Sequence, residues 1–123
     1  MSAAIRLVSV RQCKIPPATG FLLSPKWPRQ WPKTALQPEH WLRRVMPTEE
    51  LVAWMHADPN RWPTFCEVYW SDLAANPARW EALSLALEQG ELVLLHDCGD
   101  GPYTAVRALE QFLRQREAHG LAA

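Results

Sequence analysis

Short apolar runs at three places in this 123-residue chain predict the strands of a small sheet. Residues 5–10 (IRLVSV) and 20–23 (GFLL) are two short runs that favour either a hairpin or an edge pair. Residues 91–96 (ELVLLH) are continuously apolar from Leu92 to Leu95 and stop at a glycine-rich loop, which is typical of a strand buried in a parallel sheet. We therefore expect this run in the middle of the sheet. A fourth strand is expected near residues 32–36, because three strands are few for such a domain.

Apolar residues at helical spacing fill the interval between the second and third runs. Helices are expected over 38–45, after the N-cap Thr48, from residue 63 after a short turn at 59–62, and from Asn76-Pro77 to Gly90. A last helix is expected over 103–118, ended by Gly120. This order of elements predicts an α/β fold, a small Rossmann-like domain with a short, mostly parallel sheet packed by helices.

Length and cysteine content limit the class of protein. The length favours one α/β domain over residues 1–123, with 117–123 as a tail. The odd set Cys13, Cys66 and Cys98 has no C-x-x-C pair, which argues against a disulfide framework and a zinc site. The sequence shows neither a signal pattern nor a membrane-length apolar run, and its four histidines have no metal-ligand spacing. We expect a cytoplasmic protein with no membrane partner, no metal and no cofactor.

The net charge of zero conceals an asymmetry between the two parts of the chain. Residues 1–47 carry eight Lys and Arg side chains against one acid, and residues 48–123 carry five Arg against twelve acids. Either the two parts pack together and neutralise each other, or the first part presents a basic face to an anionic partner.

Residues 20–41 contain three tryptophans and four prolines, which exclude a long helix or a central strand. Aromatic rings interleaved with cations are typical of a surface that stacks nucleic-acid bases and meets phosphates. Buried tryptophans would equally fix a segment that lacks regular hydrogen bonds, and we favour this structural role for Trp27 and Trp31. The cations near them, with Arg29 first, remain the part of this segment expected to bind a partner.

The segments Trp27-Pro28-Arg29, Asp58-Pro59 with Arg61-Trp62, and the Phe65, Tyr69, Leu73 series carry a family resemblance. Over about residues 5–116 the chain resembles the YeaO-like branch of the domain-of-unknown-function 488 family, as a divergent member. The resemblance implies a small cytoplasmic α/β domain and implies no particular reaction.

The chain departs from the family pattern at polar positions and keeps the core positions. Leu23, Ser24, Pro25 and Lys26 stand where the family has Val-Asp-Arg-Leu, and Gln30 replaces a glycine. Ala57 replaces a histidine, with His56 one place early, and Tyr103-Thr104 replaces His-Asn. If those polar groups serve a common site in the family, this member has lost or changed it.

The loop HDCGDGPYT at 96–104 is the strongest candidate site, because it joins the buried strand to the last helix. Gly99, Gly101 and the amides at the helix start would suit an anion, although Asp97 and Asp100 oppose one. His96 and Cys98 share one side of an extended segment and are weak catalytic candidates, with no third orienting group. A tight turn without a ligand is the simpler interpretation of this loop. The complete set of expected ligand-binding residues is Lys26, Trp27, Arg29, Arg43, Arg44, Gly99, Gly101 and Thr104.

Three functions remain from the sequence. The favoured one is a non-enzymatic binding or interaction module whose basic face meets an anionic partner, either a nucleotide or a nucleic acid. The alternatives are a small-molecule enzyme that uses the Cys/His site at 96–104, and an inactive relative that acts through protein contacts, including contacts within a homo-oligomer.

Overall fold

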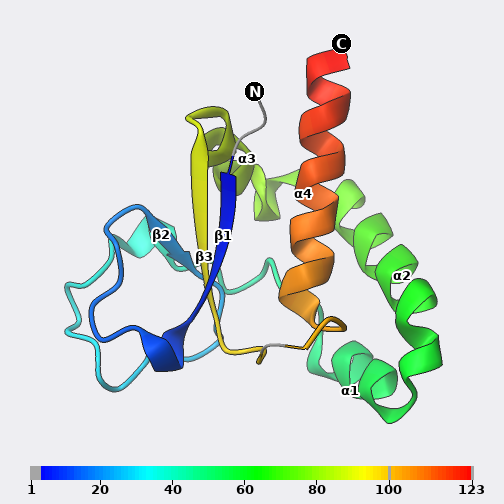
Figure 1. Ribbon diagram of the computed structural model, residues 1–123, viewed down its shortest axis with the longest axis horizontal. Helices are drawn as coiled ribbons and strands as arrows, with labels where there is room; N and C mark the ends of the chain where they lie inside the picture. Colours follow the sequence, from blue (N-terminus) through cyan, green and yellow to red (C-terminus); the bar gives the residue numbers. More distant parts are fainter. Residues whose placement is uncertain (1–3, 100, 123) are drawn as a thin grey trace.

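The three apolar runs form a parallel sheet with the third run in the centre. The computed structural model describes residues 4–99 and 101–122, with side chains as far as residue 116. Within these residues the strands β1 (Ala4–Ser9), β2 (Gly20–Leu22) and β3 (Glu91–His96) lie in the order β1-β3-β2, all parallel (Figure 1). The central position of Leu92 to Leu95 confirms the prediction. A hairpin of the first two strands is wrong, because they form the two edges on either side of β3.

The described part of the chain contains four α-helices, which follow the expected order. They are α1 (Glu49–Ala57), α2 (Trp62–Ala75), α3 (Glu81–Glu88) and α4 (Ala105–Ala122). Thr48 caps α1 as predicted, with its side-chain oxygen accepting a hydrogen bond from the Leu51 amide at 3.2 Å. The expected short turn before α2 is a 3-10 turn at Pro59–Arg61. None of the helices described is both long and apolar enough to cross a membrane.

Three local predictions are wrong. The expected helix over 38–45 is only a 3-10 turn at Pro38–His40, since Trp41 then pairs its backbone with Leu22 at the edge of β2. Residues 32–36 contain no strand, because they form turns over the sheet. Gly120 does not end the last helix, which continues to Ala122.

The two faces of β3 are covered by different kinds of structure. Leu92 and Leu94 face a large core that includes residues of all four helices. Val93 and Leu95 face a second, smaller core made by the irregular segment around residues 10–41. Figure 1 shows the helices on one side of the sheet and these loops on the other. The alternation of side chains along a strand thus divides one apolar run between two cores.

The tryptophans of the irregular segment anchor it to the sheet. Trp31 is 4% exposed and donates its indole N–H to the Cys13 carbonyl at 2.7 Å. Trp27 is half-buried, donates to the Trp31 carbonyl and packs edge-on against both Trp31 and Trp41. Trp41 donates to the Ser24 carbonyl at 2.8 Å. These contacts favour the structural interpretation of the tryptophans, because each indole N–H is satisfied by backbone and each ring packs in the second core.

Candidate functional site

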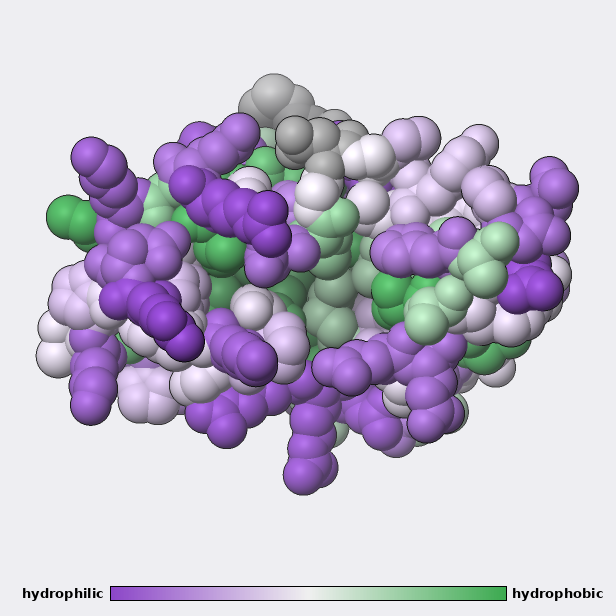
Figure 2. Space-filling view, turned by 90° about the horizontal axis from the view of Figure 1, so that it is seen from below, coloured by the Kyte–Doolittle hydropathy of each residue, from purple (hydrophilic) through white to green (hydrophobic). Residues whose placement is uncertain are grey.

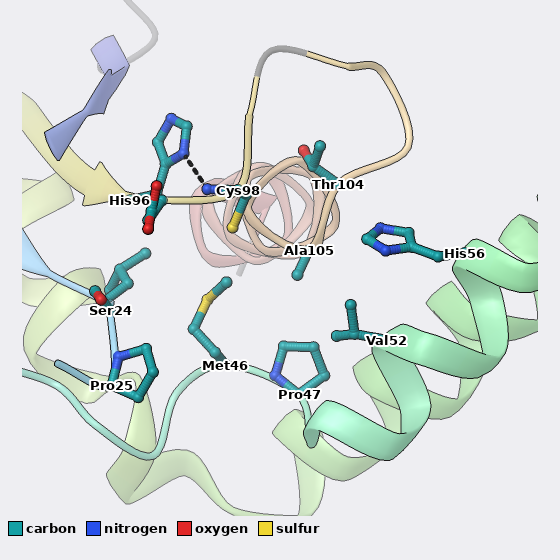
Figure 3. A pocket seen from close by; sticks show the side chains of 12 residues that line it. Ser24, Pro25, Met46, Pro47, Val52, His56, His96, Cys98, Thr104 and Ala105 are labelled. Carbon is teal, nitrogen blue, oxygen red and sulfur yellow. Dashed lines mark hydrogen bonds between the residues drawn. The ribbon is translucent and has the colours of Figure 1, made fainter. Parts of the chain in front are cut away.

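A pocket of about 230 Å³ lies at the carboxyl ends of β2 and β3. Leu23, Ser24 and Pro25 follow β2, and residues 96–98 are the end of β3 and the start of the loop after it. Thr104 precedes α4, and Ala105 is its first residue. The opposite wall comes from α1 and the residues before it. Figure 2 views this end of the molecule and shows apolar surface in a central hollow flanked by polar side chains. We call this the carboxyl-end pocket; its other lining residues are Met46, Pro47, Val52 and His56 (Figure 3).

His96 is the last residue of β3 and is buried, with 4% of its surface exposed. Its Nδ1 accepts a hydrogen bond from the Cys98 backbone amide at 3.1 Å, as the dashed line in Figure 3 shows. In the neutral ring the proton is therefore on Nε2. The nitrogen nearer to Cys98 is already used by the backbone, so His96 holds the turn after β3 and does not use Nδ1 as a base toward the thiol.

An activated nucleophilic thiol has a lowered pKa, whereas the surroundings of Cys98 raise the pKa of its thiol. Burial raises its pKa, hydrogen bonding from the Val106 backbone amide lowers it, and the charge of Asp97 raises it again. The net direction is upward, so the thiol stays protonated at neutral pH. The backbone amide at the start of α4 nevertheless has a partner in this sulfur, which gives Cys98 a structural role there.

Thr104 occupies the position before the first turn of α4, and its hydroxyl does not cap the helix. Its carbonyl accepts hydrogen bonds from the Arg107 and Ala108 amides at 3.0 and 3.2 Å. Its Oγ1 is buried and has no hydrogen-bond partner among the described residues. Thr48 shows the usual arrangement at α1, with its hydroxyl bound to the helix. Thr104 therefore keeps a buried hydroxyl that α4 does not use.

The glycines of the loop do not contribute to the pocket wall. Gly99 has a φ of +81° and marks a turn that other residues rarely adopt. Gly99 and Gly101 are exposed, and neither is among the described residues that line the pocket. Asp100 lies outside the described residues. Of the loop's predicted ligand-binding residues, Thr104 alone lines the carboxyl-end pocket.

The rim of the pocket carries one ion pair that bridges two strand ends. Arg11 Nε lies 2.9 Å from Asp97 Oδ1, and Arg11 belongs to the 3-10 turn that follows β1. No Lys or Arg is among the described lining residues. The described residues also contain no cluster of three or more His, Cys, Asp or Glu side chains that could bind a metal ion.

The basic side chains of the first part of the chain mostly lack ion pairs. Arg6 and Arg11 pair with Glu91 and Asp97 of the second part. The remaining six are exposed and form no ion pair within the described residues: Lys14, Lys26, Arg29, Lys33, Arg43 and Arg44. We call residues 14–44 the basic segment. Ion pairs between the two parts of the chain therefore neutralise two of the eight cations in residues 1–47.

Arg43 and Trp41 form an aromatic and cationic pair within the basic segment. The guanidinium carbon of Arg43 lies 3.7 Å from the centroid of the Trp41 ring. None of the six cations lines the carboxyl-end pocket, which contains Cys98 and excludes Arg29. The predicted cations thus lie in the basic segment and not in the pocket wall, whereas His96, Cys98 and Thr104 line the pocket. Gly99 and Gly101 belong to neither place.

Sequence reasoning missed the far wall of the pocket. Leu23 and Ser24 could have been found, because they follow a strand parallel to β3 and so reach the same edge of the sheet. Met46, Val52 and His56 give no such signal, since their approach to the site depends on how α1 packs.

These features define a small α/β domain whose parallel sheet presents a pocket at its carboxyl edge. The family model described as the inactive DUF488-N3 subclade matches residues 5–120. The chain therefore belongs to the DUF488 family, as the resemblance predicted, and the matching model places it in the inactive N3 subclade of that family. No curated protein and no solved structure matches the chain.

The departures from the family pattern gather at the pocket. Ser24, Pro25 and Thr104 stand at positions where polar family residues are replaced, and all three line the carboxyl-end pocket. His56, one place before a lost histidine, lines it too. Replacement of polar groups around one pocket agrees with the description of the subclade as inactive.

Proposed function

We propose that this protein is a non-catalytic binding module whose basic segment binds nucleic acid. The observation that carries this proposal is the set of six exposed cations without an ion pair in the described part of the chain. A cation that is not held by a carboxylate can neutralise a phosphate and release its counterion. The inactive subclade and the raised pKa of Cys98 support the absence of catalysis.

A polymer of phosphates suits the basic segment better than a single nucleotide. The six cations are distributed over 31 residues, and none of the six lines the carboxyl-end pocket. A mononucleotide needs a concave site that encloses its base, whereas a strand follows an open surface. Arg43, stacked on Trp41, supplies a planar guanidinium of the kind on which unpaired bases stack.

Binding is tested by fluorescence anisotropy with a labelled 20-nucleotide single strand over a series of salt concentrations. The logarithm of the affinity should fall linearly with the logarithm of the salt concentration. Each of the substitutions Arg29→Gln and Arg44→Gln should reduce the slope by about 0.7. Arg114→Gln is the matched control, because Arg114 pairs with Glu110 on α4 and should leave the slope unchanged.

The absence of binding at low salt would refute the proposal, and so would a slope that the two basic-segment substitutions do not change. Full competition by ATP would reassign the segment to nucleotides. A duplex and a single strand of equal length, compared directly, show whether stacking contributes.

Two finer points belong to the same proposal. A cytoplasmic location is supported by three free cysteines, which a reducing compartment maintains. Placement in the YeaO-like branch is supported by the Trp27-Pro28-Arg29 and Asp58-Pro59 segments.

Action through protein contacts is the second candidate, favoured by the inactive subclade. The large exposed apolar side chains come from five different segments, so no single described element presents a wide apolar face: Ile15, Trp54, Val68, Leu85 and Tyr103. A homo-oligomer stays a prediction that sedimentation at several protein concentrations checks.

A further inference from the structure

Buried polar side chains are concentrated at the carboxyl-end pocket. Among the described residues two buried side chains are polar, His96 and Thr104, at 4% and 6% exposed, and both line this pocket. A buried polar group without a hydrogen bond is unfavourable, and an apolar residue would serve a purely structural core better. The Thr104 hydroxyl is such a group among the described residues, and its place in the wall of a concave pocket points to a ligand.

The charges around the pocket favour a neutral ligand. No Lys or Arg is among its described lining residues, so an anion finds no counter-charge in the wall. The carboxylate of Asp97 is already paired with Arg11 at 2.9 Å, so a cation gains little there. At the start of α4, the Val106 amide is directed at the Cys98 sulfur and is not available to an anion.

The size and wall of the pocket favour one aromatic ring. A cavity of about 150 Å³ is enough to hold benzene. The carboxyl-end pocket, at about 230 Å³, has room for a six-membered ring with a short substituent. Figure 3 shows Met46, Val52 and Ala105 grouped below Thr104, and a methionine thioether packs well against an aromatic ring.

Thr104 supplies the polar contact for such a ligand. Its buried Oγ1 has no partner among the described residues, and staggered rotamers let the hydroxyl turn toward a bound molecule. Figure 3 shows the His56 ring extending from α1 toward Thr104 and Ala105, at the same side of the pocket.

We infer that the carboxyl-end pocket binds a small neutral aromatic molecule that carries one hydrogen-bonding group. The ring lies against Met46, Val52 and Ala105, and the polar group meets the Thr104 hydroxyl. The pocket contains none of the six cations of the basic segment, so this inference does not rest on the proposed nucleic-acid binding.

Phenol, toluene and benzoate are suitable probes, since they share one ring and differ in their polar group. Titrations are followed by methyl NMR of the full chain. Phenol should bind with a dissociation constant on the order of 1 mM, and benzoate at least about 10-fold more weakly. Thr104→Val should weaken phenol about 5- to 10-fold and leave toluene unchanged. Thr64→Val, on the exposed side of α2, is its control.

Val52→Phe, which fills the pocket, should abolish binding of phenol and toluene. The same substitution at Val68, 48% exposed on α2, should leave both unchanged. The inference is overturned if phenol does not bind, if benzoate binds as tightly as phenol, if Thr104→Val leaves phenol affinity unchanged, or if Val52→Phe still binds phenol. Nucleic-acid affinity should be the same in Val52→Phe and the unsubstituted protein, which separates this test from that of the basic segment.

Discussion

Replacing Thr104 by valine should make the protein more stable, although it removes a hydroxyl from the position before a helix. Valine keeps the branched shape of threonine and lacks the polar oxygen. The oxygen is buried without a partner among the described residues, and such a group costs about 1–3 kcal/mol. Since α4 does not use it as a cap, no hydrogen bond of the described residues is lost.

The expected gain is about 1 kcal/mol in the free energy of unfolding, equivalent to about 4 °C in melting temperature for a chain of this size. Urea unfolding followed by circular dichroism measures it, provided that the dependence on urea concentration has the same slope in both proteins. Thr48→Val is the matched control, because the Thr48 hydroxyl binds the Leu51 amide at 3.2 Å. It should lose about 1 kcal/mol.

Destabilisation of Thr104→Val to the same extent as Thr48→Val would refute the reasoning, because it would mean that the hydroxyl has a partner in the folded protein. Stabilisation together with weaker phenol binding would show a residue kept at the expense of stability, which is common at binding sites.

Three further predictions concern the tryptophans and cysteines. Trp31→Ala should lower the free energy of unfolding by about 3–5 kcal/mol. Trp54→Ala, at a residue that is 38% exposed, should lower it by less than about 1 kcal/mol. Similar losses in the two variants would contradict the anchoring role of Trp31. Because its pKa is raised, Cys98 should react with iodoacetamide at pH 7 more slowly than free cysteine, and the rate should increase as the pH rises. Mass spectrometry of peptides measures the rate of alkylation. Burial raises the pKa of Cys66 to about 11 from 9.0, so the unfolded chain ionises first and stability should fall between about pH 9 and 11. Urea unfolding across this range should show a shallower fall in Cys66→Ala, and an equal fall would exclude this thiol.

The central strand and the first helix could be predicted because their signals are local. Leu92 to Leu95 form an apolar run with clear ends, and such a run needs cover on both faces. Thr48 followed by two glutamates specifies a helix start without reference to the rest of the chain.

The expected helix over 38–45 failed because a tertiary contact outweighed a local one. The Leu42 amide donates to the Leu22 carbonyl at 2.9 Å, which extends the edge of β2 and prevents a helix from continuing. Helical propensity is a weak preference, and backbone pairing with a strand distant in the sequence cannot be read from it.

The pocket was predictable from one side only. A strand followed by a glycine-rich loop and a helix specifies residues 96–104 as a place where ligands bind. The cations of the basic segment could be counted in the sequence. Their lack of ion-pair partners could not be predicted, because it depends on which carboxylates the fold brings near them. No pattern places Met46 or Val52 opposite Cys98, since that depends on the packing of α1.

The indole of Trp41 joins the two places where this protein is expected to bind other molecules. Its ring carries Arg43 on one side, and its N–H holds the carbonyl of Ser24, a residue of the pocket wall. A strand of nucleic acid that displaces this ring also moves Ser24, and an aromatic guest that fixes Ser24 restrains the ring. Coupling between two binding sites is reciprocal. The factor by which the aromatic ligand changes the affinity for nucleic acid therefore equals the factor by which nucleic acid changes the affinity for the aromatic ligand.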